Sequence, residues 1–392
     1  MKTKNIFTNF LLFSLLVSCS VNNSTNKNIE SINIASPFAK KSVNYNYFSS
    51  DYPSKTLNLM KDVLSGTENS IVSPICYSLC MLAKGFASEN NTTFLNDLGV
   101  SSYDDFKKIV EALNWQSINS EKGQNSKIRS VMIDSIISDS PEIYFDDEAE
   151  KELNDNYIST IKTSLSDFSG DIQTYISKAL ETQISLPNLD DLVTDSVASV
   201  AGLYVKDSID DLTTTKENFV GKSKVVNTDG NQFTDISLYY KGTNYQVFKY
   251  NIQYTDMIII LPDEGVELSS INYLDAYNNY LENKEQYEIH GWLPYFELDE
   301  ELPLTSTSRA SLNGLSPYTY LVKGNFNQPN SCIQKNKFSF NKNGIEGSSV
   351  TIEYYDGAVM VDKEVSINVT RPFYAISLYD NLPLFAMSVC DI

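Results

Sequence analysis

The side chains of this sequence that could carry out acid–base chemistry are one histidine and two acidic clusters. His290 is the single histidine among 392 residues, and it lies beside an apolar, aromatic run, which favours a structural role over a catalytic one. Asp263-Glu264 and Asp299-Glu300-Glu301 could supply the paired carboxylates of a glycoside hydrolase. Acidic runs in so acidic a chain are usually solvated loops, so the hypothesis of a hydrolase rests on these pairs alone.

Motifs of the common catalytic and nucleotide-binding loops are missing from the sequence. It contains no GxSxG nucleophile elbow, no GxGxxG loop and no Walker loop. With one histidine, it also cannot form an HExxH zinc site or a histidine-rich metal centre. We therefore predict that the chain is not an enzyme, and that it uses no cofactor and no metal.

The charge of the chain restricts its partners. Thirty Lys and Arg residues stand against 50 Asp and Glu residues, which gives a net charge of −20. Such a chain repels phosphate backbones and heparin-like polyanions, so we expect no nucleic-acid partner and no heparin-type accelerator.

The N-terminus has the features of a secretory signal. Lys2 and Lys4 form a short positive region, and Ile6–Val17 is mostly apolar but too short to span a bilayer stably. Leu16-Val17-Ser18-Cys19 then resembles the lipobox of bacterial lipoproteins. The resemblance implies that residues 1–18 are removed, that Cys19 carries the lipid, and that the protein lies on the extracellular face of a bacterial membrane.

The rest of the chain divides into a tether and one domain. Residues 20–47 are rich in Asn, Ser and Lys, which predicts a flexible tether over 19–47 and a single domain over 48–392. Removal of the signal takes away two lysines, leaving 28 basic against 50 acidic residues and a net charge of −22. No second apolar stretch is long enough to span a membrane, so we expect membrane contact through the lipid anchor only. Ordinary secretion, with Cys19 incidental, is the alternative.

The remaining cysteines form neither a zinc-like pattern nor a disulfide scaffold. Cys76 and Cys80 lie on one face of a predicted helix, and Cys332 and Cys390 are distant from them in the chain. We expect buried free thiols, with one disulfide as the alternative.

The elements that would hold these side chains alternate irregularly between helices and strands. Ser73-Pro74 starts a helix well, because serine caps the free amides of the first turn and proline fits there. Residues 75–86 are apolar nearly all round, which predicts a buried helix. Further helices are predicted at Tyr103–Leu113, Asp146–Thr160 and Asp171–Ile184.

The second half of the sequence is richer in strand patterns. Tyr239–Tyr250 alternates as a strand does, and Thr228-Asp229-Gly230-Asn231 predicts a turn. Met257–Leu261 is a continuous apolar run, which is typical of a strand covered on both faces. Phe373–Leu378 and Leu382–Val389 predict a buried hairpin. Together these patterns favour one mixed α+β domain.

Six segments of the sequence resemble motifs of the serpin family, and they occur in the order of that family. Each match is short, but together they extend over roughly residues 48–392. The resemblance implies a serpin-like α+β fold, with three β-sheets, about eight or nine helices and an exposed reactive-centre loop near the C-terminus. The matching segments are Asn69–Leu79 with Leu82–Gly85, Ala201–Lys206, Met257–Pro262, Leu293–Phe296, Asn341–Glu346, and Arg371–Phe373 with Leu384–Val389.

Serpins inhibit serine or cysteine proteases as suicide substrates. The protease cuts the reactive loop, and the freed loop then inserts as an extra strand into the largest sheet. The resemblance implies that this chain is a monomeric serine-type endopeptidase inhibitor, whose partner is a target serine protease or a cysteine protease. Some serpins bind or carry ligands instead, so a non-inhibitory serpin-fold surface binding or adhesion protein is the alternative.

The hinge of the reactive loop has the composition of a strand that can enter a sheet. Small residues let the sheet part around them, and the β-branched residues that follow suit a strand. Inward-facing positions would be Ile345, Gly347, Ser349 and Thr351, with Glu346 facing outward. Two positions depart from the family: Lys342 replaces an acidic residue, and Ile345 replaces Thr or Ser. The hinge residues are Gly344, Ile345, Glu346, Gly347, Ser348, Ser349 and Val350.

The scissile bond is less well defined than the hinge. The family's spacing from the hinge glycine places it at Ala358–Val359, which suits elastase-like or subtilisin-like proteases. The loop is a few residues longer than is usual in the family, so the bond falls in a window that also contains Tyr355, Asp356, Gly357 and Met360. Cleavage after Tyr355 would instead suit a chymotrypsin-like protease.

The shutter, where the sheet of a serpin opens, would here be formed by Ser73, Pro74 and Gln334. Gln334 stands where the family often has histidine, Ala201 where it has asparagine, and Cys76 where it has a second serine. We expect a buried polar network with fewer hydrogen bonds, and a changed rate of sheet opening.

Overall fold

The structure of the chain, a computed structural model, describes residues 52–88, 95, 99–100, 102–116, 129–138, 144–162, 173–174, 176–178, 180, 197–207, 213–252, 255–303, 319–323, 333–347, 363–379 and 381–392. The predicted signal peptide, Cys19 and the tether lie outside these residues and remain predictions.

Helices and three sheets make up the described part of the chain, in agreement with a mixed α+β class. It contains five α-helices with complete bounds, fewer than the eight or nine that the family resemblance implied. They are α1 (Tyr52–Asn58), α2 (Pro74–Phe86), α4 (Tyr103–Ala112), α5 (Asp147–Asp155) and α7 (Tyr273–Asn283), with a 3-10 helix, η1, at Leu268–Ser270.

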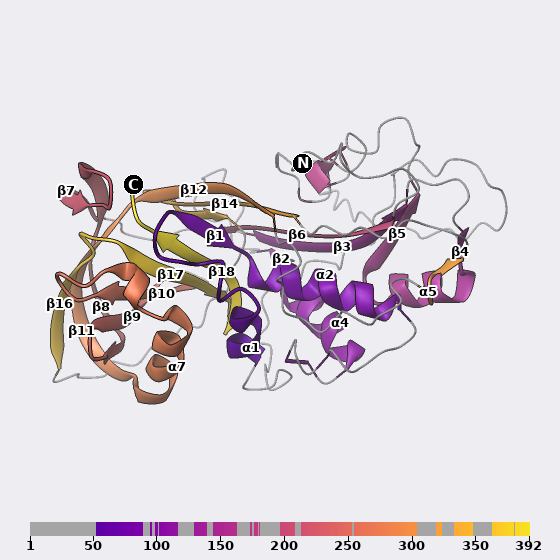
Figure 1. The fold of residues 1–392 in the computed structure, drawn as a ribbon, viewed down its shortest axis with the longest axis horizontal. Helices are drawn as coiled ribbons and strands as arrows, with labels where there is room; N and C mark the ends of the chain where they lie inside the picture. Colours follow the sequence, from indigo (N-terminus) through magenta and orange to yellow (C-terminus); the bar gives the residue numbers. More distant parts are fainter. Residues whose placement is uncertain are drawn as a thin grey trace, which may run out of the picture.

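The seven-stranded sheet runs along the top of the molecule in Figure 1, with α2 beneath it. Its strands are ordered β12-β14-β15-β6-β3-β2, and β5 pairs with β3 beside β2. All pairs are antiparallel except β3 with β5. The bounds are β12 (Phe296–Pro303), β14 (Ile333–Asn341), β15 (Gly344–Gly347), β6 (Val197–Asp207), β3 (Arg129–Ser138), β2 (Trp115–Gln116) and β5 (Ile158–Lys162).

A nine-stranded sheet lies against one end of the first. Its order is β1-β18-β17-β10-β9-β8-β11-β16, with β7 paired to β8. The bounds are β1 (Ser70–Val72), β18 (Leu382–Val389), β17 (Phe373–Tyr379), β10 (Asp256–Pro262), β9 (Tyr245–Asn251), β8 (Val225–Lys241), β11 (Glu285–Pro294), β16 (Glu364–Asn368) and β7 (Thr213–Val220). A third, two-stranded sheet joins β13 (Val322–Lys323) to β4 (Tyr144–Phe145).

Aromatic side chains join the two large sheets in one core. Phe338 of β14 packs on Phe385 of β18 with ring centroids 5.7 Å apart, and Phe296 of β12 meets Phe373 of β17 at 5.6 Å. The predicted strand Met257–Leu261 is confirmed as part of β10, whose apolar residues are buried on both faces. The predicted C-terminal hairpin is confirmed as β17 and β18.

The helix predicted after Ser73-Pro74 is confirmed as α2. Ser73 caps it, because its Oγ accepts a hydrogen bond from the Cys76 amide at 3.4 Å, and Pro74 takes the first helical position. Most side chains of α2 are buried, as the pattern predicts, because the helix packs against β6, β3 and β18.

Three local predictions are wrong. The helix predicted over Asp146–Thr160 ends at Asp155, because Tyr157 adopts a left-handed conformation (φ 65°), and β5 follows. The predicted strand Tyr239–Tyr250 is the end of β8 and most of β9. The turn predicted at Thr228–Asn231 lies inside β8, where Gly230 lets β11 approach: a Cβ on it would come within 2.5 Å of the Leu293 carbonyl oxygen.

The helix predicted over Asp171–Ile184 is described in part. Described residues between 173 and 180 are helical, and the rest of the range lies outside the described residues.

Candidate functional site

The predicted hinge begins in a tight hairpin that joins β14 to β15. Asn341 pairs with Gly344 across the turn, and the Asn341 Oδ1 accepts a hydrogen bond from the Asn343 amide at 2.8 Å. Gly344 has a φ of +108°, a conformation that residues with a side chain rarely adopt. The exposed Lys342, which departs from the family pattern, lies in this turn.

The first hinge residues form a strand that is paired on both edges. Ile345 lies opposite Phe340 of β14 and Asp207 of β6, so β15 is a central strand of the seven-stranded sheet. Ile345 is 2% exposed, whereas Glu346 is exposed and its Oε1 accepts a hydrogen bond from the Tyr204 hydroxyl at 3.2 Å. The side chains therefore alternate as the sequence pattern predicts.

Beyond β15, the facing edges of β6 and β14 have no described strand between them. The last described pair on the β6 side is Gly347 with Val205. Among the described residues, β15 is the one strand that links β14 to β6, and these two strands form no pair with each other. We call β6 from Val197 to Tyr204, with β14 from Ile333 to Phe338, the facing edges.

Gln334, one of the predicted shutter residues, ties β14 to the start of α2. Its Oε1 accepts a hydrogen bond from the Ser73 amide at 2.8 Å, and its Nε2 donates to the Ser73 carbonyl oxygen at 2.8 Å. Asn336 extends the network, donating to the Gln334 Oε1 and to the Ile71 carbonyl oxygen, each at 3.0 Å. A glutamine in place of histidine thus still satisfies the backbone groups at the helix cap.

The β6 and β3 side of the same region is different. Ala201 of β6 lies opposite Asp134 of β3, and residues opposite each other in a sheet point to the same face. Asp134 is 1% exposed, and neither of its carboxyl oxygens has a hydrogen-bond partner. Burial raises the pKa of Asp134 well above its usual range, and burial together with the nearby Asp134 raises the pKa of Cys76 to about 12.

Neither Asn336 nor Asp134 is singled out by the sequence analysis. Asn336 lies two residues from Gln334 on the same face of β14, so strand alternation was a usable signal for it. Asp134 is one acid in a strand-like stretch, and its burial depends on strands from distant parts of the chain.

The rest of the predicted site lies outside the described residues. These residues are Ser348, Ser349 and Val350 of the hinge, Tyr355, Asp356, Gly357, Ala358, Val359 and Met360 around the reactive bond, and Cys19.

The single histidine has structural contacts on the surface of β11. Its Nδ1 lies 3.1 Å from the Thr234 hydroxyl, and its Nε2 lies 3.5 Å from a carboxyl oxygen of Glu288. Among the described contacts of His290, the Thr234 hydroxyl is the one group that could act as a nucleophile.

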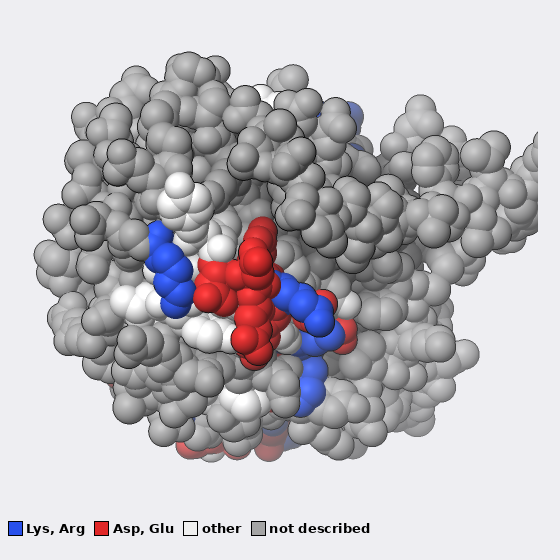
Figure 2. Space-filling model, turned by 90° about the vertical axis from the view of Figure 1, so that its right-hand side faces the viewer, with Lys and Arg blue, Asp and Glu red and all other residues white. Residues whose placement is uncertain are grey.

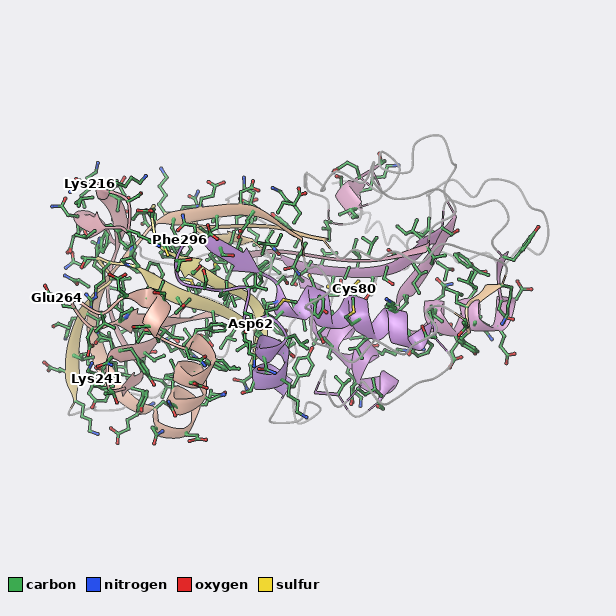
Figure 3. The ribbon with its side chains drawn as sticks, in the orientation of Figure 1. Asp62, Cys80, Lys216, Lys241, Glu264 and Phe296 are labelled. Carbon is green, nitrogen blue, oxygen red and sulfur yellow. The ribbon has the colours of Figure 1, made fainter. Side chains whose placement is uncertain are left out.

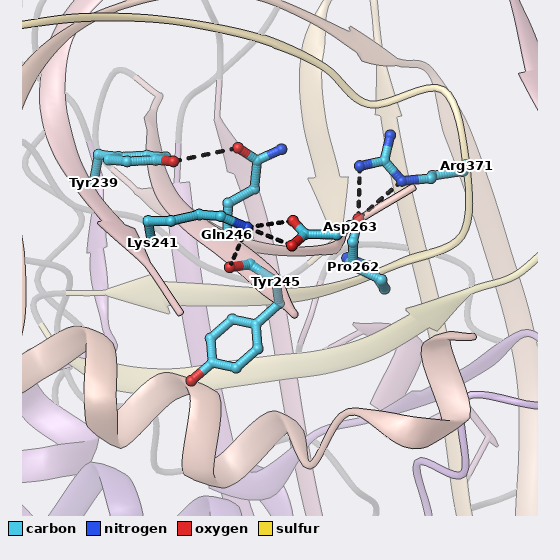
Figure 4. Close-up of polar contacts among 7 residues, drawn as sticks. All are labelled: Tyr239, Lys241, Tyr245, Gln246, Pro262, Asp263 and Arg371. Atoms are coloured by element: carbon cyan, nitrogen blue, oxygen red, sulfur yellow. Dashed lines mark hydrogen bonds and ion pairs between the residues drawn. The ribbon is translucent and has the colours of Figure 1, made fainter. Parts of the chain in front are cut away.

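The acidic clusters also make structural contacts. Figure 4 shows the side chain of Lys241 directed at Asp263, with the Lys241 Nζ 2.6 Å from the Asp263 Oδ2, while Arg371 donates to the Pro262 carbonyl oxygen. In β12, Glu300 accepts a hydrogen bond from the Ile71 amide at 2.8 Å, and Asp299 pairs with Lys335.

Cys76, Cys80 and Cys390 form no disulfide, and Cys332 lies outside the described residues. Figure 3 shows Cys80 on α2 beneath the seven-stranded sheet, where its thiol donates to the Ser199 carbonyl oxygen at 3.5 Å. Over the described ranges, no three His, Cys, Asp or Glu side chains gather as a metal site.

Acidic side chains gather among the described residues at the end of the molecule that carries α5. Figure 2 shows its Asp and Glu side chains together, with lysines beside them; α5 supplies Asp147, Glu148 and Glu150 in its first turn. None of the described helices is long and apolar enough to cross a membrane.

Comparison with known proteins gives the fold. No protein-family model and no curated protein matches the sequence. Among solved structures, cleaved Serpin 42Da superposes with a TM-score of 0.70 at 16% identity, over 87% of this chain and 97% of that one. Serpin48 from the insect Tenebrio molitor gives 0.67 at 14% identity, over 88% and 99%.

Two further solved structures are also similar to the chain. The native thermophilic serpin tengpin has a TM-score of 0.63 at 16% identity, over 91% of this chain and 97% of that one. Human thyroxine-binding globulin, in complex with its ligand, has a TM-score of 0.66 at 13% identity, over 88% and 99%. The chain therefore has the serpin fold, as its sequence motifs imply.

Proposed function

We propose that this chain inhibits serine proteases as a suicide substrate, by cleavage of its reactive loop and insertion of that loop into the seven-stranded sheet. The observation that carries the proposal is the position of β15. The hinge residues Gly344–Gly347 are paired with β14 on one edge and with β6 on the other. The facing edges begin where β15 ends, so in the inserted form that we propose a loop that continues β15 would lie between two strands and pair with both.

The registers of the described pairs support continued insertion. Glu346 lies opposite Lys206 on one side and Ser339 on the other. In the inserted form that we propose, the same antiparallel registers would bring Thr351 opposite Ala201 and Gln334. Thr351 is one of the predicted inward-facing residues, so a small polar side chain would meet the shutter.

The target and the location of the protein are part of the proposal. Small aliphatic residues at Ala358–Val359 favour an elastase-like or subtilisin-like protease, and Tyr355 would favour a chymotrypsin-like one. The lipobox-like segment ending at Cys19 favours a lipid anchor on a bacterial surface. Labelling of the wild-type protein with a fatty acid in cells, and loss of the label in Cys19→Ser, would test the anchor.

The inhibitory function is tested by mixing the chain with proteases of these three classes. We expect a covalent complex that survives denaturing electrophoresis, since the protease is trapped as an acyl-enzyme. Mass spectrometry of the released C-terminal peptide locates the cleaved bond. Complete cleavage of the loop by every protease, with no complex, would contradict inhibition.

A hinge variant makes this test specific to insertion. Ile345→Arg puts a charge at a buried position of β15, so we expect the loop to be cut while the covalent complex is lost. Asn343→Arg is the matched control, because it adds the same charge at an exposed position two residues earlier. We expect this control to form the complex as the wild type does.

A non-inhibitory binding protein is the second candidate. The observation in its favour is the similarity to thyroxine-binding globulin, a structure solved with thyroxine bound. Heat stability separates the two candidates, because insertion relaxes a strained chain. We expect the melting temperature to rise strongly after the loop is nicked; an unchanged melting temperature would favour the binding protein.

A further inference from the structure

Asp134 is a buried acid to which the proposed cleavage and insertion assign no role. Its side chain is 1% exposed, in the middle of β3. The backbone amide of Ser135 lies near enough to stabilise the carboxylate a little, but neither carboxyl oxygen has a partner at hydrogen-bond geometry. Buried polar atoms without partners are rare in folded proteins, so such a residue calls for an explanation.

The neighbours of Asp134 among the described residues come from β5, β6 and α2. On the two neighbouring strands, Asp134 pairs with Ala201 of β6 and with Ile158 of β5. From α2, Cys76 faces it closely enough that the charge of Asp134 raises the pKa of the Cys76 thiol. Cys76 is therefore uncharged at neutral pH and cannot compensate an ionised Asp134.

Asp207 shows how a buried acid is usually accommodated in the same sheet. It lies in β6, also 1% exposed, and its Oδ2 accepts hydrogen bonds from the amide and the hydroxyl of Thr255, each at 2.9 Å. Asp134 has the same burial without this compensation. The packed state around Asp134 is thus compatible with the neutral acid and strongly disfavours the carboxylate.

We propose that Asp134 is a proton-controlled switch in the seven-stranded sheet: protonated, it allows β3 and β6 to pack on α2, and ionised, it favours their separation from that helix. The ionised carboxylate becomes hydrated when the sheet lifts from α2, whereas the protonated acid is stable in the packed state without water. Ala201, beside Asp134, lies on the facing edge of β6, where the proposed function places the inserted loop.

The direction of the pH effect follows from proton linkage. The pKa of Asp134 is raised in the packed state and ordinary in an opened or unfolded state. The packed state therefore binds the proton more tightly, and low pH stabilises it. Its stability decreases as the pH rises from the ordinary pKa of aspartate, about 4, to the raised pKa of the packed state. The link to protease inhibition rests on the proposed function, whereas the proton-linked opening does not.

Urea unfolding of the full chain at pH 5, 6, 7 and 8 tests the proton linkage. In Asp134→Asn the titrating group is gone, so we expect the ratio of the unfolding constants, wild type over variant, to rise by at least about tenfold between pH 5 and pH 7. Asp207→Asn is the matched control, because it changes another buried sheet carboxyl to its amide. The unfolding constant of Asp207→Asn should keep the pH dependence that the titration of Asp134 gives to the wild type.

A ratio for Asp134→Asn that does not change with pH would overturn the proposal. Should this variant fail to fold, Asp134→Val serves in its place, since it replaces the acid by a residue of similar volume that suits a strand. The infrared band of a protonated carboxylic acid gives an independent reading at pH 7. We expect the band in the wild type and not in the Asp134 variant; its absence from the wild type would also overturn the proposal.

Amide hydrogen exchange tests the opening itself. At one pH the intrinsic exchange chemistry is the same for both proteins, so a difference reports how often the strands open. We expect the amides of β3 and β6 to exchange about tenfold faster in the wild type than in Asp134→Asn at pH 8, and at similar rates at pH 5. Equal rates at both pH values would overturn the proposal, and since no protease is present, this failure leaves the inhibitory function untouched.

Discussion

The two facing edges, on β14 and on β6, are joined to α2 in different ways. On the β14 side, Gln334 satisfies both the amide and the carbonyl of Ser73, and Asn336 satisfies the Ile71 carbonyl. Glu300 of the neighbouring strand β12 accepts from the Ile71 amide. A set of hydrogen bonds to backbone groups thus joins this half of the sheet to the helix cap.

On the β6 side, fewer of the described hydrogen bonds reach the same helix. Ala201 is apolar, Asp134 has no partner, and Cys80 donates a long hydrogen bond of 3.5 Å to the Ser199 carbonyl oxygen. Contact here depends mainly on the packing of α2 against β6 and β3. Among the described contacts, the β14 side of the shutter thus has more hydrogen bonds to the helix cap than the β6 side has to α2.

The difference indicates which half of the sheet can move. Separation of β14 from α2 would break several hydrogen bonds to buried backbone groups, whereas separation of β6 and β3 would break fewer of the described hydrogen bonds and would hydrate the carboxyl group of Asp134. We infer that β3 and β6 move as a unit while β14 stays with the helix cap. The following variants would break or sharpen this comparison.

The largest effect is expected from Gln334→Leu. This change removes the acceptor of the Ser73 amide and one of the donors to the Ser73 carbonyl oxygen, which keeps its hydrogen bond from the Tyr77 amide at 3.2 Å. Because Ser73 is 1% exposed, its amide would be left without compensation. We expect a loss of about 2 kcal/mol in the free energy of unfolding, since one buried unsatisfied group costs roughly 1–3 kcal/mol. Urea unfolding followed by circular dichroism measures it.

Lys337→Ala is the control for this substitution on the same strand. Lys337 is exposed and pairs with Glu297 at 2.8 Å, and such surface ion pairs contribute little, so we expect a change below about 0.5 kcal/mol. If Gln334→Leu cost no more than this control, β14 would not be fastened to the helix cap by Gln334, and the comparison would fail.

The elements whose position was predicted correctly are those with signals in the local sequence. Serine and proline at the start of α2 act within one turn, so their effect is visible from the sequence alone. Gly230 shows the limit of such signals. It resembles a turn residue, but it is needed because β11 lies against it, and that contact joins segments about sixty residues apart.

The candidate site also has features that the local sequence predicts and features that depend on the whole fold. The inward and outward positions of Ile345 and Glu346 followed from simple alternation, whereas the location of the hinge came from the family resemblance. Asp134 could not be predicted, because acids in a strand are usually exposed. Its burial arises from pairing with β5 on one side and β6 on the other, both set by the whole fold.

A smaller effect is expected from Ala201→Asn, which would give Asp134 a partner. The side chain at 201 points to the same face as Asp134 on the adjacent strand, so an amide there is placed to donate a hydrogen bond to the carboxyl group. The bond favours the carboxylate, so the pKa of Asp134 in the packed state decreases and less stability is lost as the pH rises. We expect a gain of about 1 kcal/mol at pH 8 and a smaller gain at pH 5.

The same substitution in an Asp134→Val background shows whether the gain belongs to the pair. With no carboxyl group to accept the hydrogen bond, Ala201→Asn should bring no gain and no change with pH, and the double-mutant cycle then assigns the difference to the interaction of residues 201 and 134. A gain that persists without Asp134 would mean that the new amide acts elsewhere. In that case the weak attachment of the β6 side would not be due to its unpaired acid, and the movement of β3 and β6 would need another cause.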